Sequence, residues 1–596
     1  MRKILISLSI LLTLFSTSCT KWLDVNKNID TPDWVPPILR LAPAIAAYEG
    51  IAYDLRGLNP MMQYWGGTAA TYATTFGNDH SFAAGSDAMG EAWRMVYFLQ
   101  GMNIEDMIND ARARGEYRLA GIALTIKAFS WNILGSFHGD IIVKDAFVPG
   151  LLSHSYDNQE LAFLMTRTWA RQAIAEFEKT DLTSYPSTLA TFDLVYQGEA
   201  AKWKKFAYAV LARNYMTISK KDPKYLDSAI DCANLSFTSA AESPSARVDA
   251  TTSTNSNFFG VIRANITGYT NYSQSDYMVQ LMTGRIPYYD QTGTQNGILS
   301  QQYITDTLTL DPRSILYFGT TTLMPENQSE IVPGYFKFYG FKAGQTPTVG
   351  LFGLAATATA TTSGTGRWIY RDNAPVLLTS YAEIQFVKAE ALYRKGLYSQ
   401  AYDAFKIAVA ASIEHAKSFI VPGTIVRNTS NVQTSVIGDK ITAARYQELA
   451  NIYLASQYVN GLGYQNLTLS HIMLQKYVAL YPWSYETWND LRRYHYDLLL
   501  GPNGVPVSGT SWSTTRVYHK SDSDPTRIYK GFYLPAADVT NRRDAFPSAN
   551  LGSPCYRLRP RYNSEYMWNL ASLKALTPIA GDADNYHTSM VWFTLP

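Results

Sequence analysis

Residues 381–417, YAEIQFVKAEALYRKGLYSQAYDAFKIAVAASIEHAK, contain the pattern that decides the fold of this chain. Apolar residues recur at helical spacing on both sides of Gly396, which predicts one helix over 381–395 and a second over 398–417. The few residues between them leave room only for a tight turn. The stretch therefore predicts a helical hairpin.

The hairpin has the small and large residues of a tetratricopeptide-like repeat. The matching positions are Ala389, Leu392, Gly396, Ala401, Phe405 and Ala408. The alanines let two helices approach closely, and Phe405 fills the groove between them. Such hairpins stack in one dimension, so a chain too long for a single compact core can still bury its apolar residues.

Other segments show the same helical periodicity and predict a mostly α protein. They are residues 91–112, 117–137, 193–219, 443–460 and 469–480. Residues 238–371 and 501–525 instead are rich in Thr, Ser, Asn, Gly and Tyr. We interpret them as long irregular insertions with a few short strands, because helical segments resume soon after each one.

The amino terminus has the features of an exported lipoprotein. Arg2 and Lys3 precede an apolar run over 4–15, and small residues at 16–18 precede Cys19. We expect residues 1–18 to be a signal peptide and Cys19 to be acylated, which would anchor the protein to a membrane. A secreted protein without the lipid is the main alternative, since Ser16 replaces the usual aliphatic residue. A retained membrane helix is the lesser one, because the apolar run is shorter than the roughly 20 residues that span a bilayer. No later segment looks transmembrane.

The charge balance argues against a nucleic-acid partner. Without Arg2 and Lys3, 49 basic residues face 49 acidic ones, so the exported chain is near neutral. Nucleic-acid binders normally present an electropositive face. Aromatic residues reach 13%, and those not needed in the core are available to stack on a ligand.

Motifs for catalysis, cofactors and metals are missing from the sequence. Residues 24–30 resemble half of a calcium loop, but Ile29 and Val35 occupy its glycine and glutamate positions, so we expect no metal site. A pair of catalytic carboxylates cannot be recognised by spacing, which leaves a surface glycoside hydrolase as an alternative.

Cys232 and Cys555 are as compatible with two buried thiols as with one disulfide.

Residues 483–494 contain a concentration of aromatic and charged side chains. On a helix, Asp490 and Arg493 can pair, and Arg492 can stack on Trp488. We interpret this stretch as a helix packed within the scaffold rather than as a binding site.

Several short motifs, in order along nearly the whole chain, resemble the SusD/RagB family of nutrient-binding outer-membrane lipoproteins. They are residues 19–26 (CTKWLDVN), 126–140, 196–213, 311–313 (DPR), 374–391 and 475–493. Each is weak alone; together behind a lipoprotein signal they carry the resemblance.

The resemblance implies a mostly α, SusD-like scaffold of four tetratricopeptide-like hairpins, forming a single domain over residues 19–596. Family members are not enzymes. They sit at the outer-membrane surface, capture oligosaccharides or peptides, and pass them to a SusC-like TonB-dependent transporter as its lid. The resemblance implies no cofactor. A helical-repeat scaffold that binds only other proteins remains a second alternative.

Sugar capture requires exposed aromatic faces and hydrogen-bonding side chains in a concavity, which we expect in the loops at about 60–90 and 240–371. Glycines beside Trp65 would let a ligand approach the backbone. The candidate ligand-binding residues are Trp65, Tyr72, Asp79, Tyr269, Tyr272, Tyr288, Trp368 and Arg371.

Overall fold

The computed structural model describes most of the helical scaffold and short parts of the loops. The described residues are 34–67, 89–249, 256–260, 272–282, 302–303, 310–318, 337–338, 368–421, 424–427, 429, 433–437, 441–501, 520–532, 534, 554–576 and 583–596.

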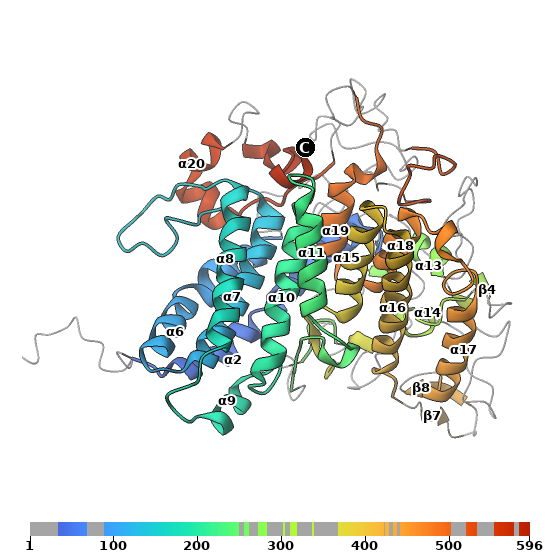
Figure 1. The fold of residues 1–596 in the computed structure, drawn as a ribbon, viewed down its shortest axis with the longest axis horizontal. Helices are drawn as coiled ribbons and strands as arrows, with labels where there is room; N and C mark the ends of the chain where they lie inside the picture. Colours follow the sequence, from blue (N-terminus) through green and yellow to red (C-terminus); the bar gives the residue numbers. More distant parts are fainter. Residues whose placement is uncertain are drawn as a thin grey trace, which may run out of the picture.

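Long helices packed side by side form the body of the protein, from α6 at the left of Figure 1 to α17 at the right. Each helix contacts its neighbours, so the core extends along the row. These helices are α6 (Gly101–Ala113), α7 (Tyr117–His138), α8 (Gln159–Phe177), α10 (Ala200–Thr217), α11 (Lys224–Leu235), α15 (Tyr381–Arg394), α16 (Tyr398–Lys417), α18 (Leu469–Ala479) and α17 (Ala443–Ala455).

Shorter helices cover the faces and ends of this row. The α-helices are α2 (Leu41–Ala46), α3 (Glu49–Met61), α5 (Glu91–Arg94), α9 (Pro186–Phe192), α13 (Asp276–Met282), α14 (Ser314–Tyr317), α19 (Ser484–Arg493) and α20 (Leu570–Ala575). Two segments are π-helical, η2 (Met95–Gln100) and η9 (Tyr562–Tyr566). The 3-10 turns are η1 (Pro37–Arg40), η3 (Ala240–Glu242), η5 (Trp368–Tyr370), η6 (Tyr464–Asn466), η7 (His495–Asp497), η10 (Ala583–Thr588) and η11 (Trp592–Thr594).

The strands of the described residues form two-stranded antiparallel pairs. They are β1 (Trp65–Gly67) with β3 (Tyr272–Gln274), β2 (Ser245–Ala246) with β6 (Val376–Leu377), β4 (Gln302–Tyr303) with β5 (Lys337–Phe338), and β7 (Thr424–Arg427) with β8 (Gln433–Ile437). The mostly α fold class predicted from the sequence is confirmed.

Local capping explains where several helices begin. The Asn158 side chain accepts the Leu161 N–H at 2.9 Å, and Ser380 accepts the Glu383 N–H at 3.0 Å. Between α15 and α16, Gly396 has a φ of +77°, a conformation that favours glycine and reverses the chain. The hairpin predicted from residues 381–417 is therefore formed as expected.

The other predicted helices are confirmed with changed boundaries. The segment 91–112 contains the π-helix η2 between α5 and α6. The segment 193–219 becomes helical only at Ala200, because the Asp193 carboxylate accepts the backbone N–H groups of Tyr196 and Gly198. These bonds hold residues 193–198 in a turn.

Helix α7 is the central element of the first half of the row. It is long and apolar enough to cross a membrane by composition, but its apolar window is wholly buried among its neighbours. Helices α6, α8 and α10 pack around it. We therefore assign α7 to the core of the helical body.

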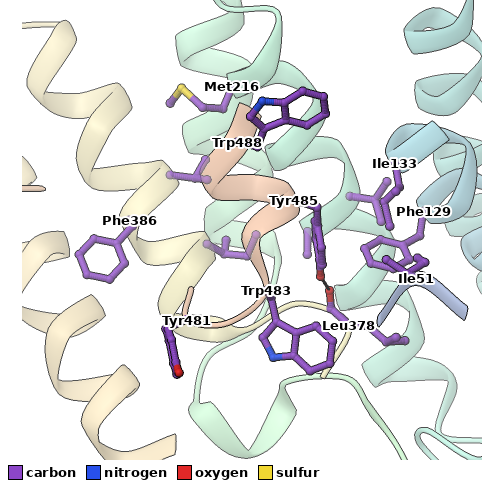
Figure 2. Packing of buried hydrophobic residues seen from close by; sticks show 14 of the residues in the cluster. Ile51, Phe129, Ile133, Met216, Leu378, Phe386, Tyr481, Trp483, Tyr485 and Trp488 are labelled. Carbon is purple, nitrogen blue, oxygen red and sulfur yellow. Dashed lines mark hydrogen bonds between the residues drawn. The ribbon is translucent and has the colours of Figure 1, made fainter. Parts of the chain in front are cut away.

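Helix α19 packs against α3, α7 and α10, and an Arg493–Glu390 ion pair joins it to α15. The close-up in Figure 2 shows buried side chains of α19, Tyr485 and Trp488 among them. Trp488 is fully buried, the Arg492 guanidinium lies 3.5 Å from the Trp488 ring centroid, and Arg493 bonds Asp490 at 2.6 Å. The Tyr485 hydroxyl donates to the Leu378 carbonyl at 2.5 Å. The interpretation of residues 483–494 as a packed scaffold helix is confirmed.

A buried ion-pair network joins α15, α18 and α19. Arg493 donates to both carboxylate oxygens of Glu390, at 2.6 and 2.8 Å, and Lys476 pairs with Asp490 at 2.7 Å. All four side chains are nearly inaccessible to water. Buried charges are stable only when paired, so these groups hold the three helices together.

Cys232 and Cys555 are both buried free thiols, which resolves the two alternatives left open by the sequence. Burial raises the pKa of Cys232 to about 11 and that of Cys555 to about 12, so both are protonated at neutral pH.

Replacing Arg493 with Met should lower the free energy of unfolding by about 3–5 kcal/mol, because Glu390 and Asp490 would keep buried charge without their main partner. Lys202→Met removes a solvent-accessible pair with Glu199 and should cost less than about 1 kcal/mol. Urea unfolding followed by circular dichroism measures both; equal losses would contradict a special role for the buried network.

The buried pair of Arg493 and Glu390 also makes the stability of the protein depend on pH. Burial alone would raise the pKa of Glu390, but Arg493 and Lys476 lower it from 4.5 to about 2. The folded state therefore binds this proton more weakly than the unfolded chain, and the contribution is lost as pH falls from about 4.5 toward 2. When unfolding is measured at a series of pH values, the free energy of unfolding should fall less steeply with falling pH in Arg493→Met than in the native protein. Identical slopes in the two proteins would contradict this account.

Candidate functional site

Two of the sequence stretches predicted to bind ligand lie side by side in the structure. Strand β1 pairs with β3, so that Trp65 lies opposite Gln274 and Gly67 opposite Tyr272. These residues are about two hundred positions apart in the sequence. The pairing brings the ends of the two candidate loops, after Gly67 and before Tyr272, to one place on the scaffold.

The third stretch predicted to bind ligand, which contains Trp368 and Arg371, reaches the same place through an aromatic cluster. The Trp368 ring stacks on Tyr317 with centroids 4.1 Å apart, and Tyr481 stacks near both rings. Tyr481 also contacts Tyr64, the neighbour of Trp65, at 5.3 Å. The three stretches chosen from the sequence therefore converge on one cluster.

The cluster is bonded to the scaffold as well as packed against it. The Tyr64 hydroxyl donates to the Tyr477 carbonyl of α18 at 2.5 Å and is 2.6 Å from Thr487 Oγ1 of α19. The hydroxyls of Tyr370 and Tyr481 lie 2.8 Å apart. Burial raises the pKa values of Tyr64 and Tyr481, so these hydroxyls stay neutral and act as hydrogen-bonding groups.

The expectation that Trp65 and Trp368 present exposed faces is wrong. Trp65 is 0% exposed and Trp368 is 2% exposed. The Trp65 ring contacts Phe259 edge-on at 5.8 Å, while Trp368 is held by its stacked tyrosines. In this structure both rings pack inside the protein, and neither presents a face to solvent.

Arg371 also has an internal role. It is 8% exposed, and its guanidinium donates to the Phe419 carbonyl at the end of α16. This bond fixes the chain just after η5. In this structure the Arg371 guanidinium is turned toward the Phe419 carbonyl, and a contact of Arg371 with ligand stays a prediction.

The remaining candidates lie outside the described residues. They are Tyr72, Asp79, Tyr269 and Tyr288, together with Cys19 and the calcium-loop-like residues 24–30. Tyr272 belongs to β3, and its side chain is likewise outside the description. Their roles stay predictions.

Asp54 and Glu486 are buried carboxyl groups that have a raised pKa but sit within the scaffold. Burial raises the pKa of Asp54 to about 7, while its oxygens accept the N–H groups of Glu91 and Ala92 at 3.1 and 2.8 Å. Glu486 lies 3.2 Å from Arg213, and burial likewise raises its pKa. Both groups anchor helices.

Among the described residues, no group of three or more His, Cys, Asp or Glu side chains could hold a metal ion.

The structure contains a hollow that the sequence reasoning missed, between η2 and η9, with a volume of about 500 Å³. Trp93, Tyr97 and Phe98 form one side of it. One sequence signal could have found it. The run MVYFL at 95–99 is apolar on every side of a helix, more than an amphipathic helix with one buried face requires.

The fold and site together define a class of protein: a row of packed helices in which three segments distant in sequence, at Trp65, Gln274 and Trp368, meet at one aromatic cluster. The profile of the SusD-like family, described as starch-binding and associating with the outer membrane, matches residues 47–511. The chain belongs to the SusD-like family.

Solved structures with the same fold agree with this assignment. A SusD/RagB family protein from Bacteroides thetaiotaomicron is 22% identical, with a TM-score of 0.60 over 94% of this chain and 99% of that chain. A chitin-binding protein is 18% identical, with a TM-score of 0.57 over 94% and 100%. A chitin-binding SusD homologue from Flavobacterium johnsoniae is 17% identical, with a TM-score of 0.54 over 94% and 97%. No curated protein matches the chain significantly.

Trp368→Ala should lower the free energy of unfolding by about 3–5 kcal/mol, because it removes a buried ring that stacks on Tyr317. Trp568→Ala is the matched control: that ring is 76% exposed, and its loss should change stability by less than about 0.5 kcal/mol. Urea unfolding measures both. If Trp368→Ala keeps the stability of the native protein but binds ligand more weakly, the expectation that this ring contacts the ligand would be restored.

Proposed function

We propose that this protein is a cell-surface, nutrient-binding lipoprotein that captures oligosaccharides and delivers them to a SusC-like TonB-dependent transporter, over which it acts as a lid. The observation that carries the proposal is the SusD-like family match over residues 47–511. The chitin-binding names of two structural relatives favour a saccharide over a peptide. The protein then works by binding, without catalysis, as a single domain over residues 19–596.

The loops that emerge around the aromatic cluster are the proposed ligand-binding site. The cluster keeps Gly67, Tyr272 and Trp368 together, so loops that are distant in sequence share a rigid base. Tyr72, Tyr269, Tyr272 and Tyr288 would supply rings for stacking. Asp79 would accept hydrogen bonds from sugar hydroxyls.

Isothermal titration of the chain from Thr20 onward with malto- and chito-oligosaccharides and short peptides tests this proposal. We expect saturable heat with a saccharide, and Tyr72→Ala or Tyr269→Ala to weaken it about 3- to 10-fold by removing one stacking ring. Tyr464→Ala removes an exposed tyrosine in η6 and should leave affinity unchanged.

Three results would contradict parts of the proposal. Saturation by peptides alone would replace the ligand class. Heat that persists after every injection, with shortened sugars in the product, would indicate a glycoside hydrolase. Tight association with an outer-membrane partner and no response to any small ligand would indicate a protein-binding scaffold.

The proposed outer-membrane location depends on Cys19. Cys19→Ser should lose incorporation of labelled palmitate and move from the outer-membrane fraction to the soluble fraction, because the hydrocarbon anchor is absent. Cys232→Ser changes a buried thiol and should stay in the membrane fraction. Membrane retention of Cys19→Ser without label would contradict a lipid anchor at this position.

A further inference from the structure

The hollow of about 500 Å³ has walls from distant parts of the chain. One wall comes from α5 and η2, and includes Tyr97 and Phe98; the facing wall comes from η9 and the residue before it, and includes Arg561, Ser564 and Glu565. The volume falls within the range typical of small-molecule sites. Its lining combines aromatic rings with a few polar groups, as such sites require.

Both walls are built on π-helical turns. Met95–Gln100 and Tyr562–Tyr566 are π-helices, which are rare, occur mostly as single turns and are frequently found at functional sites. An extra residue in the turn changes the direction of the side chains that follow. Two such turns facing the same hollow indicate that the positions of its lining side chains matter.

The aromatic wall is rigid at its base and open at its edge. Trp93 and Tyr97 have ring centroids 4.8 Å apart, and the Tyr97 hydroxyl donates to the Ile142 carbonyl at 2.7 Å. Phe98, the next residue, is 72% exposed. The packing of the protein therefore leaves one large ring facing water at the mouth of a hollow that other rings line.

The polar wall is held in place by buried hydrogen bonds. Glu565 is buried and accepts from the Tyr156 hydroxyl at 2.6 Å and from Asn569 Nδ2 at 2.9 Å. Asn569 also accepts from the Ser153 hydroxyl at 2.9 Å and donates to the His154 carbonyl at 3.0 Å. These bonds connect η9 to the loop before α8 and stabilise the shape of the hollow.

Charges around the hollow offset one another. Arg94 pairs with Glu91 at 3.3 Å, while Arg561 and Glu565 lie on the same wall. Such a lining does not select strongly for an anion or a cation. It fits a neutral molecule with one apolar face and a polar edge.

We propose that this hollow is a second saccharide-binding site, separate from the loops around the aromatic cluster. The C–H face of a neutral sugar ring would stack on Tyr97 and Phe98, and its hydroxyls would bond Ser564 and Arg561 on the opposite wall. The inference rests on the proposed function only for the class of ligand. It places a second sugar contact beside the amino-terminal helices α5 and α6.

Titration calorimetry with maltotriose and with triacetylchitotriose tests the second site in the chain from Thr20 onward. For at least one sugar we expect two binding events, and Phe98→Ala should weaken one of them about 3- to 10-fold. Ser564→Ala should weaken the same event. Phe98 is exposed, so its replacement should leave the circular dichroism spectrum and the unfolding midpoint unchanged.

The control variants separate the two sites. Tyr464→Ala should leave both events unchanged, and Tyr72→Ala should weaken only the event that Phe98→Ala spares. If Phe98→Ala and the native protein respond identically to both sugars, including no response at all, the second site is overturned. Loss of sugar binding in Tyr72→Ala with a native response in Phe98→Ala would overturn this inference and leave the proposed function standing.

Discussion

The structure depends on the pairing of charges that lie inside the helical body. Arg493 joins α19 to α15 through Glu390, and Lys476 joins α18 to α19 through Asp490. A second pair, Arg213 with Glu383 at 2.8 Å, joins α10 to α15. Removing two charges from water is costly, so each pair is stable only when the helices that supply it stand in one arrangement.

These pairs give the weak sequence motifs a physical meaning. The residues that resemble the SusD/RagB family include Arg213, Asp311, Glu390, Lys476 and Arg493. In the structure they are the buried charged groups that connect separate helices; Asp311, for example, holds Arg313, which donates to Gln475 of α18 at 2.7 Å. At these five positions the shared motifs therefore report on the scaffold rather than on the ligand.

The scaffold in turn supports the region from which the loops emerge. Tyr481 and Trp483 lie between α18 and α19, and they contact the rings of Trp368 and Phe259. Through Tyr64 and Phe259, the same cluster reaches β1 and its pairing with β3. The cluster therefore connects the residues that border the loops, after Gly67 and before Tyr272, to the helical scaffold.

Sequence alone predicted many of the long helices, though not α8 and α11, because apolar spacing such as that at 381–395 and 398–417 reports which face of a helix is buried. Local capping sets the ends of several of them. The sequence also identified the family. It could not separate a ring that stacks on ligand from one that packs inside, since Trp65 and Trp368 have the same composition around them in either case. Tertiary structure alone decided their burial, the pairing of Arg493 with Glu390, and the hollow between η2 and η9. Each depends on contacts between residues about one hundred to several hundred positions apart, whose distance in space no local pattern encodes.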